Sequence, residues 1–134
     1  LLASSAASDV YKRQLLERLR QEGVRTAVVS NKPDRTTRTL AARFFPELDG
    51  AMGQREGIAS KPAPDMVRAA LDQLHAAPEE TLYVGDSEVD VATARNAGLD
   101  MIGVAWGFRG RAALEAAGAP LVADTPEQLL DMLQ

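Results

Sequence analysis

Small polar and charged residues follow two apolar segments of the chain, where a strand would end. Ser30 comes after the apolar run 24–29, and Asp86 and Asp90 come after the run 81–84. Lys61 lies between these segments, directly before a proline. Phosphoryl transfer uses hydroxyl and ammonium groups to bind phosphate oxygens and carboxylates to hold Mg²⁺. The residue types therefore predict a phosphate site at Ser30 and Lys61 and a magnesium site at Asp86 and Asp90.

Each of these residues also has a purely structural interpretation. The segment from Ser87 to Asp90 fits the S-x-x-D pattern of a helix cap, and Asp86 could equally cap that helix. Ser30 fits an ordinary strand-to-helix turn, and a lysine before a proline is commonly a surface residue. The order of the three segments in one chain favours the chemical interpretation.

Alternating apolar runs and helical patterns predict the elements that would position these residues. Five strands are expected, at 24–29, 51–53, 81–84, 100–105 and 121–123, with helices between them and at both ends. In the helix expected at 34–44, we predict Leu40, Ala41 and Phe44 to face inward. Strands that alternate with helices favour a parallel sheet covered on both faces. We therefore expect one α/β domain.

Composition excludes several classes of function. The net charge of −4 gives no electrostatic support to nucleic-acid binding. No apolar run approaches the length of about 20 residues needed to span a bilayer. The chain has no cysteine, which excludes disulfides and thiolate metal sites and favours a reducing cytoplasm.

Three motifs, VVSNKP, KPAPD and LYVGDSEVD, occur in this order and together resemble the second, third and fourth motifs of the haloacid dehalogenase superfamily of phosphatases. The segments ATARNAGLDMIGVAWGFRG and AGAPLVADTPEQLLDML are similar to its phosphoglycolate phosphatase branch. The resemblance covers nearly everything in 15–134. It implies a Rossmann-like three-layer α/β/α fold with a mostly parallel sheet. It also implies a Mg²⁺-dependent phosphatase that acts on a small phosphorylated metabolite through an aspartyl-phosphate.

The resemblance extends to single residues of the three motifs. It implies that Ser30, Asn31 and Lys61 bind the phosphoryl group, with Asn31 beside it, and that Lys61 is also the catalytic residue that steadies its charge. It further implies that Asp86 ligates Mg²⁺ and that Asp90 is a supporting acid of the same metal site.

The superfamily's first motif, an Asp-x-Asp-Gly-Thr run, is absent from the sequence, which contains no Asp-x-Asp. In the family this motif supplies the nucleophile and the general acid, and a substrate-selecting cap domain normally follows it. Loss of a nucleophile costs on the order of 10⁶ in rate in an unrelated hydrolase. We therefore expect the chain alone to be inactive and the substrate to be undetermined by its sequence.

The amino-terminal residues 1–14 look like a non-native leader, because 4–14 resemble translated adapter sequence. We expect the natural protein to continue upstream and the core domain to comprise 15–134. The first, central strand of the sheet would then be missing, between the strands ending at Ser30 and Gly85. Unpaired strand edges there predict marginal stability and self-association.

Two further hypotheses stay open from the sequence. One is a non-catalytic module that binds phosphate, Mg²⁺ or a partner protein through the same residues. The other is a receiver-like or nucleotide-binding α/β domain, although the sequence has neither G-x-G-x-x-G nor a Walker lysine motif.

Overall fold

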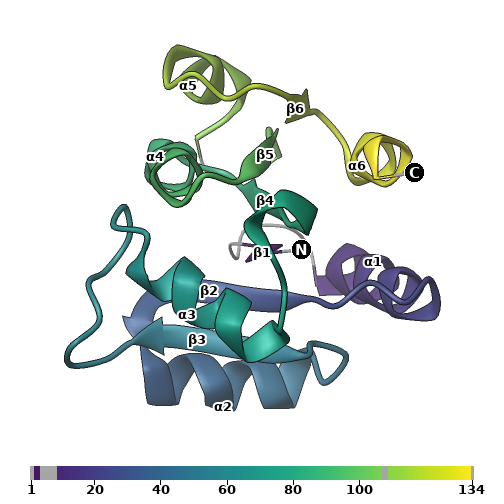
Figure 1. Cartoon of the computed structure of the whole chain (residues 1–134). Helices are drawn as coiled ribbons and strands as arrows, with labels where there is room; N and C mark the ends of the chain where they lie inside the picture. Colours follow the sequence, from purple (N-terminus) through teal and green to yellow (C-terminus); the bar gives the residue numbers. More distant parts are fainter. Residues whose placement is uncertain (1, 4–8, 107–108, 134) are drawn as a thin grey trace.

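The computed structural model describes residues 2–3, 9–106 and 109–133 of the chain. Strands and helices alternate along it, as the apolar pattern predicts (Figure 1). The strands are β1 (Leu2–Ala3), β2 (Ala27–Pro33), β3 (Gly50–Gln54), β4 (Leu82–Gly85), β5 (Asp100–Val104) and β6 (Val122–Ala123). The helices are α1 (Asp9–Gln21), α2 (Asp34–Phe44), α3 (Asp65–Leu74), the 3₁₀ helix η1 (Pro78–Glu80), α4 (Glu88–Ala97), α5 (Arg111–Ala116) and α6 (Pro126–Met132).

The six strands form one parallel sheet in the order β3-β2-β1-β4-β5-β6. Helices α3, α4 and α5 pack on one face of it, over a core that includes Met66, Val67 and Leu114. Helices α1 and α6 pack on the other face, over a second core that includes Leu19 and Leu129. The predicted three-layer α/β/α class is therefore confirmed.

The centre of the sheet differs from the expectation. The central strand was predicted to be missing, but β1 lies between β2 and β4 and pairs with both. Leu2 aligns with Ala27 and Tyr83, and Ala3 aligns with Val28 and Val84. The prediction was wrong because it treated 1–14 as a leader outside the fold, whereas two apolar residues are enough to pair the neighbouring edges over a short length. The helix α1 also begins at Asp9, inside that segment.

The orientation predicted for α2 is only partly correct. Ala41 is buried, but Leu40 and Phe44 are 39% and 45% exposed, and Thr37 takes the inward position instead. The helix lies very close to β3, because a Cβ at Gly53 would come within 2.5 Å of the Thr37 Oγ1. Only small side chains fit in so narrow a space, which turns the larger apolar residues outward.

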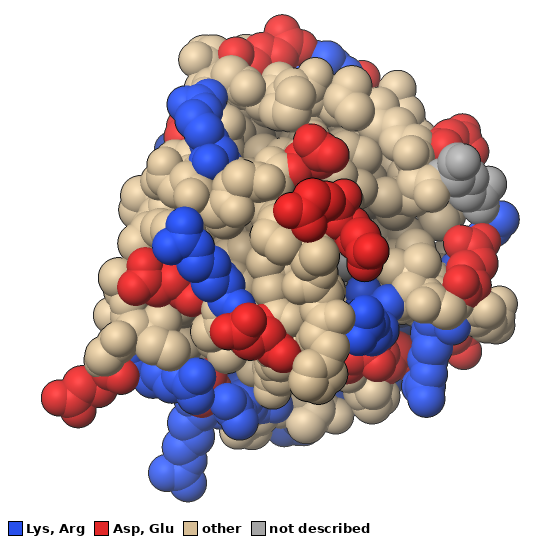
Figure 2. All heavy atoms as spheres, in the orientation of Figure 1, with Lys and Arg blue, Asp and Glu red and all other residues tan. Residues whose placement is uncertain are grey.

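Surface features agree with a domain of mixed charge. Acidic and basic side chains are interspersed on the face seen in Figure 2. None of the helices among the described residues combines the length and apolar character needed to cross a bilayer.

Candidate phosphate site at the carboxyl edge of the sheet

The predicted site residues lie at the carboxyl ends of β2 and β4, on both sides of the central strand. Ser30 and Asn31 belong to the last part of β2, and Asp86 directly follows β4. Lys61 comes from the loop between β3 and α3, and Asp90 from the first turn of α4. A pocket of about 240 Å³ opens here and is lined by Ser30, Asn31, Lys61 and Asp90 among others. Ligands of open α/β sheets bind at this edge.

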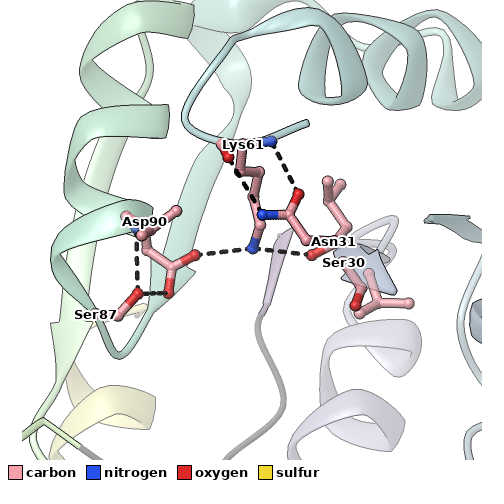
Figure 3. Close-up of a pocket in the computed structure, with 8 residues that line it drawn as sticks. Ser30, Asn31, Lys61, Ser87 and Asp90 are labelled. Atoms are coloured by element: carbon pink, nitrogen blue, oxygen red, sulfur yellow. Dashed lines mark hydrogen bonds and ion pairs between the residues drawn. The ribbon is translucent and has the colours of Figure 1, made fainter. Parts of the chain in front are cut away.

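The ammonium group of Lys61 forms the centre of the site (Figure 3). It donates to Asp90 Oδ1 at 3.0 Å, to the Val29 carbonyl oxygen at 3.3 Å and to the Tyr83 hydroxyl at 3.3 Å. Its side chain is only 8% exposed, and that of Asp90 only 1%. An ion pair buried to this degree holds its partners in a defined place, since an unpaired charge there would be costly. The lysine is therefore a fixed positive charge at the pocket and not a mobile surface residue.

The carboxylate of Asp90 accepts four hydrogen bonds from within the chain. Its Oδ1 receives the Tyr83 hydroxyl at 2.8 Å in addition to Lys61. Its Oδ2 receives the Asp86 backbone N–H at 3.0 Å and the Ser87 hydroxyl at 3.2 Å. Burial raises the pKa of Asp90, but the charge of Lys61 and the hydrogen bonds from Tyr83, Lys61 and the Asp86 N–H lower it by a larger amount, so that the pKa lies below its ordinary value.

Gly85 makes room for this arrangement. A Cβ at Gly85 would lie 2.3 Å from the Asp90 Cβ and 2.4 Å from its Cγ, so a larger residue would push the carboxylate out of place. The capping interpretation of the sequence also holds, because the Ser87 hydroxyl accepts from the Asp90 N–H at the start of α4. Capping and ion pairing thus occur together in one turn.

Asn31 holds the main chain of Lys61. Its Oδ1 accepts from the Lys61 N–H at 2.9 Å, and its Nδ2 donates to the Lys61 carbonyl oxygen at 3.2 Å (Figure 3). The phosphate contact expected of Asn31 stays a prediction. Ser30 lines the pocket, and its Oγ accepts from the Lys32 N–H at 3.1 Å, which leaves the hydroxyl proton to donate.

The carboxylates give a less complete picture of a metal site. No group of three or more His, Asp or Glu side chains within the described ranges is arranged to hold a metal ion. The oxygens of Asp90 are directed at Lys61, Tyr83, Ser87 and the backbone of Asp86. Both residues carry carboxylates, the type of ligand that a hard cation prefers. The magnesium roles of Asp86 and Asp90 stay predictions.

Two residues of the site have no counterpart in the sequence predictions. Tyr83 was interpreted only as part of an apolar strand, yet its buried hydroxyl donates to Asp90. A tyrosine within a buried strand needs a partner for its hydroxyl, and this need was the available signal. Asn96, near the end of α4, donates to the Pro62 carbonyl oxygen at 2.9 Å. It lies in the segment that resembles the phosphoglycolate phosphatase branch, but the sequence predicts no role for it.

Comparisons with known proteins agree on one family. The family profile of the haloacid dehalogenase-like hydrolases matches residues 6–98, more than half of the chain. The chain is 32% identical over 125 residues to pyrophosphatase PpaX of Bacillus mycoides, which covers 90% of this chain and 57% of the relative.

Solved structures give the same result. A "putative phosphoglycolate phosphatase" from Lactobacillus delbrueckii subsp. bulgaricus has a TM-score of 0.89 and 42% identity, over 92% of this chain and 52% of that one. A predicted phosphatase from Clostridium acetobutylicum has a TM-score of 0.81 and 27% identity, over 90% and 56%. The chain spans about half the length of the relatives it matches. By its motifs, its fold and these matches, the chain belongs to the haloacid dehalogenase-like hydrolases.

Proposed function

We propose that the protein is a Mg²⁺-dependent phosphatase of small phosphorylated metabolites, and that this chain carries the phosphate-binding part of its active site. The main support is the buried Lys61 ammonium, which three acceptors fix at the edge of a pocket of about 240 Å³. A fixed cation in a partly dry site stabilises a phosphoryl group more strongly than a mobile cation in water does.

The phosphoryl group would be recognised by two side chains. The Ser30 hydroxyl would donate to one of its oxygens, and the Lys61 ammonium group, which contacts the neighbouring Val29 carbonyl oxygen, would offset its negative charge. Asp86 would hold Mg²⁺, which when bound would neutralise further charge on the phosphoryl group. Attack by an aspartate to form an aspartyl-phosphate is part of the proposal, as is a cytoplasmic location.

The substrate is proposed only as a small phosphate or diphosphate compound. The named relatives include a pyrophosphatase and a phosphoglycolate phosphatase, and the size of the pocket suits a small molecule. Phosphoglycolate is the substrate favoured by the similarity of the later segments. Pyrophosphate is the compound to compare with it.

A second candidate function is a non-catalytic module that binds phosphate, Mg²⁺ or a partner protein. It is supported by the pocket itself, in which Ser30, Asn31 and Lys61 come together in a way that suits binding of a phosphorylated ligand. The same pocket would then bind a phosphorylated ligand without turnover.

The first test measures both binding and turnover by this chain. We expect titration calorimetry with inorganic phosphate in the presence of Mg²⁺ to show binding that is lost in Lys61→Met, because the fixed charge is removed. We expect no hydrolysis of p-nitrophenyl phosphate by the chain. Asp86→Asn serves as the control for metal dependence.

The outcomes separate the two candidates. Hydrolysis that disappears in Asp86→Asn would show that the chain has a nucleophile of its own, and the expectation of inactivity would be wrong. No phosphate binding by the unmodified chain would contradict the assignment of the pocket. Binding without turnover, followed by turnover when an Asp-x-Asp-Gly-Thr segment of a relative is joined upstream, would support the phosphatase over the module.

A further inference from the structure

The loop that carries Lys61 is held in place by side chains that contact its main chain. This loop runs from 55 to 64, between β3 and α3, and the main chain of residues 61 and 62 makes three hydrogen bonds with side chains. Two of them come from Asn31 at the end of β2. The third comes from Asn96 on α4, whose Nδ2 donates to the Pro62 carbonyl oxygen at 2.9 Å.

One helix therefore contacts both the ammonium group of the lysine and the loop that carries it. In its first turn α4 presents Asp90, which binds the ammonium group at 3.0 Å. In its last turn α4 presents Asn96, which binds the main chain one residue after the lysine. The distance between these two contacts is set by the rigid geometry of the helix. A lysine side chain otherwise has several rotatable bonds and loses much conformational freedom when it is held.

We infer that Asn96 is a positioning residue for Lys61: it fixes the backbone from which the lysine extends, and α4 thereby sets where the positive charge lies in the pocket. This inference rests on the proposed phosphate site and adds a residue outside its motifs. Asn96 does not line the pocket, so its effect on a ligand would be transmitted through the loop. Asn96 would therefore affect where the positive charge of Lys61 lies, while the charge itself is present with or without Asn96.

The chain offers a matched control next to Asn96. Arg95 is also exposed, lies in the same turn of α4, and donates from its Nη2 to the Ala117 carbonyl oxygen at 3.2 Å. Its contact ties α4 to the end of α5 and does not involve the Lys61 loop. Arg95→Ala thus removes a comparable side-chain contact of the helix end without touching the lysine.

The experiment compares Asn96→Ala and Arg95→Ala in the whole chain by two measurements. The first is the affinity for inorganic phosphate with Mg²⁺ present. We expect Asn96→Ala to weaken binding roughly three- to tenfold, the effect of one hydrogen bond, and Arg95→Ala to leave it unchanged. The second is the ¹⁵N signal of the Lys61 ammonium. Burial protects its protons from exchange, and we expect the signal to broaden or shift only in Asn96→Ala.

Each outcome bears on the inference. Equal phosphate affinity in Asn96→Ala and the unmodified chain, or equal losses in both variants, would overturn it. If the unmodified chain binds no phosphate, the proposed function fails while the ammonium signal still decides the role of Asn96. A Lys61 signal that is unchanged in Asn96→Ala would then refute the positioning role, and a change confined to that variant would support it. Asn96→Gln keeps the amide donor, so we expect it to retain part of the phosphate affinity that is lost in Asn96→Ala.

Discussion

The carboxylate of Asp90 connects four other residues of the candidate site. Its two oxygens accept from Lys61, Tyr83, Ser87 and the backbone of Asp86. Contacts with the charged carboxylate lower the pKa of Asp90. A carboxyl group with a lowered pKa in the folded state adds stability at pH values above its ordinary pKa of 3.8, and this stability is lost as the pH falls through the lower, folded value.

This linkage gives a prediction for acid unfolding. At pH 7 we expect Asp90→Asn to lower the free energy of unfolding by about 3–5 kcal/mol, because Lys61 is left buried without its partner. Below pH 3.8 the difference from the unmodified chain should shrink, because Asp90 is protonated first in the unfolded state and in the folded state only at its lower pKa. Urea unfolding at a series of pH values measures both effects.

Two further variants test whether the Asp90 carboxylate causes this pH dependence of stability. Tyr83→Phe removes one hydrogen bond to the same carboxylate, so the pKa of Asp90 should rise and the acid limb of the stability curve should move to higher pH. Asp72→Asn, which changes an exposed aspartate on α3, should leave the curve nearly unchanged. A constant stability difference between Asp90→Asn and the unmodified chain from pH 7 to pH 2 would contradict the linkage.

At the residue scale, the sequence indicates which residue types form the site but not how they contact one another. Ser30, Lys61 and Asp90 line one pocket, as expected of residues at one sheet edge. The pairing of Lys61 with Asp90 spans 29 positions and depends on how a loop folds onto α4. Asn96 could not be predicted at all, because an exposed asparagine near a helix end has no distinctive pattern.

Helix ends follow local sequence signals. The Thr125 hydroxyl accepts from the Gln128 N–H, as its capping-box sequence indicates, and Gly98 ends α4 in the left-handed conformation. The inward face of α2 was predicted poorly, because the space between that helix and β3 is a property of the packed pair. The apolar period of α2 alone favours Leu40 and Phe44.

Two equivalent helix ends give a prediction at the scale of elements. Both α3 and α4 end with a left-handed residue, His75 at φ 54° and Gly98 at φ 72°. A side chain makes this conformation unfavourable, so His75→Gly should raise the free energy of unfolding by about 0.5–1 kcal/mol. Gly98→Ala should lower it by about 1 kcal/mol.

Urea unfolding of these two variants measures the change in midpoint at constant slope. A Cβ at Gly98 would meet no atom within 4 Å, so the expected loss there is conformational and not steric. The bond from Arg25 to the His75 carbonyl oxygen belongs to the backbone of residue 75 and should persist in His75→Gly. A loss of stability in His75→Gly would contradict this account of the helix ends.

For the whole molecule, the central strand changes the reason for which self-association was expected. β1 supplies both neighbouring strands with a partner over two residues, and β3 and β6 form the outer edges of the sheet. Self-association stays a prediction, now tied to how well these two residues hold their neighbours.

Sedimentation velocity provides the test of this prediction. We expect the fraction of dimer or larger species to increase with protein concentration and to increase further in Ala3→Pro, because proline cannot donate to a strand partner. Ala112→Ser is the control, because it changes an exposed residue of α5 and should have no effect. Ala116→Pro is not suitable as a control because it disrupts a helix. If the unmodified chain and Ala3→Pro are both monomeric at all concentrations, the prediction is contradicted.

The position of β1 has a mechanical consequence. The sheet consists of two blocks, β3-β2 and β4-β5-β6, and the short β1 is the strand that joins them. Ser30 belongs to the first block, and Asp86 and Asp90 belong to the second or follow it directly. Lys61 contacts both, through Val29 and through Asp90. A movement of one block relative to the other would therefore change the distance from the Lys61 ammonium group to at least one of these two contacts.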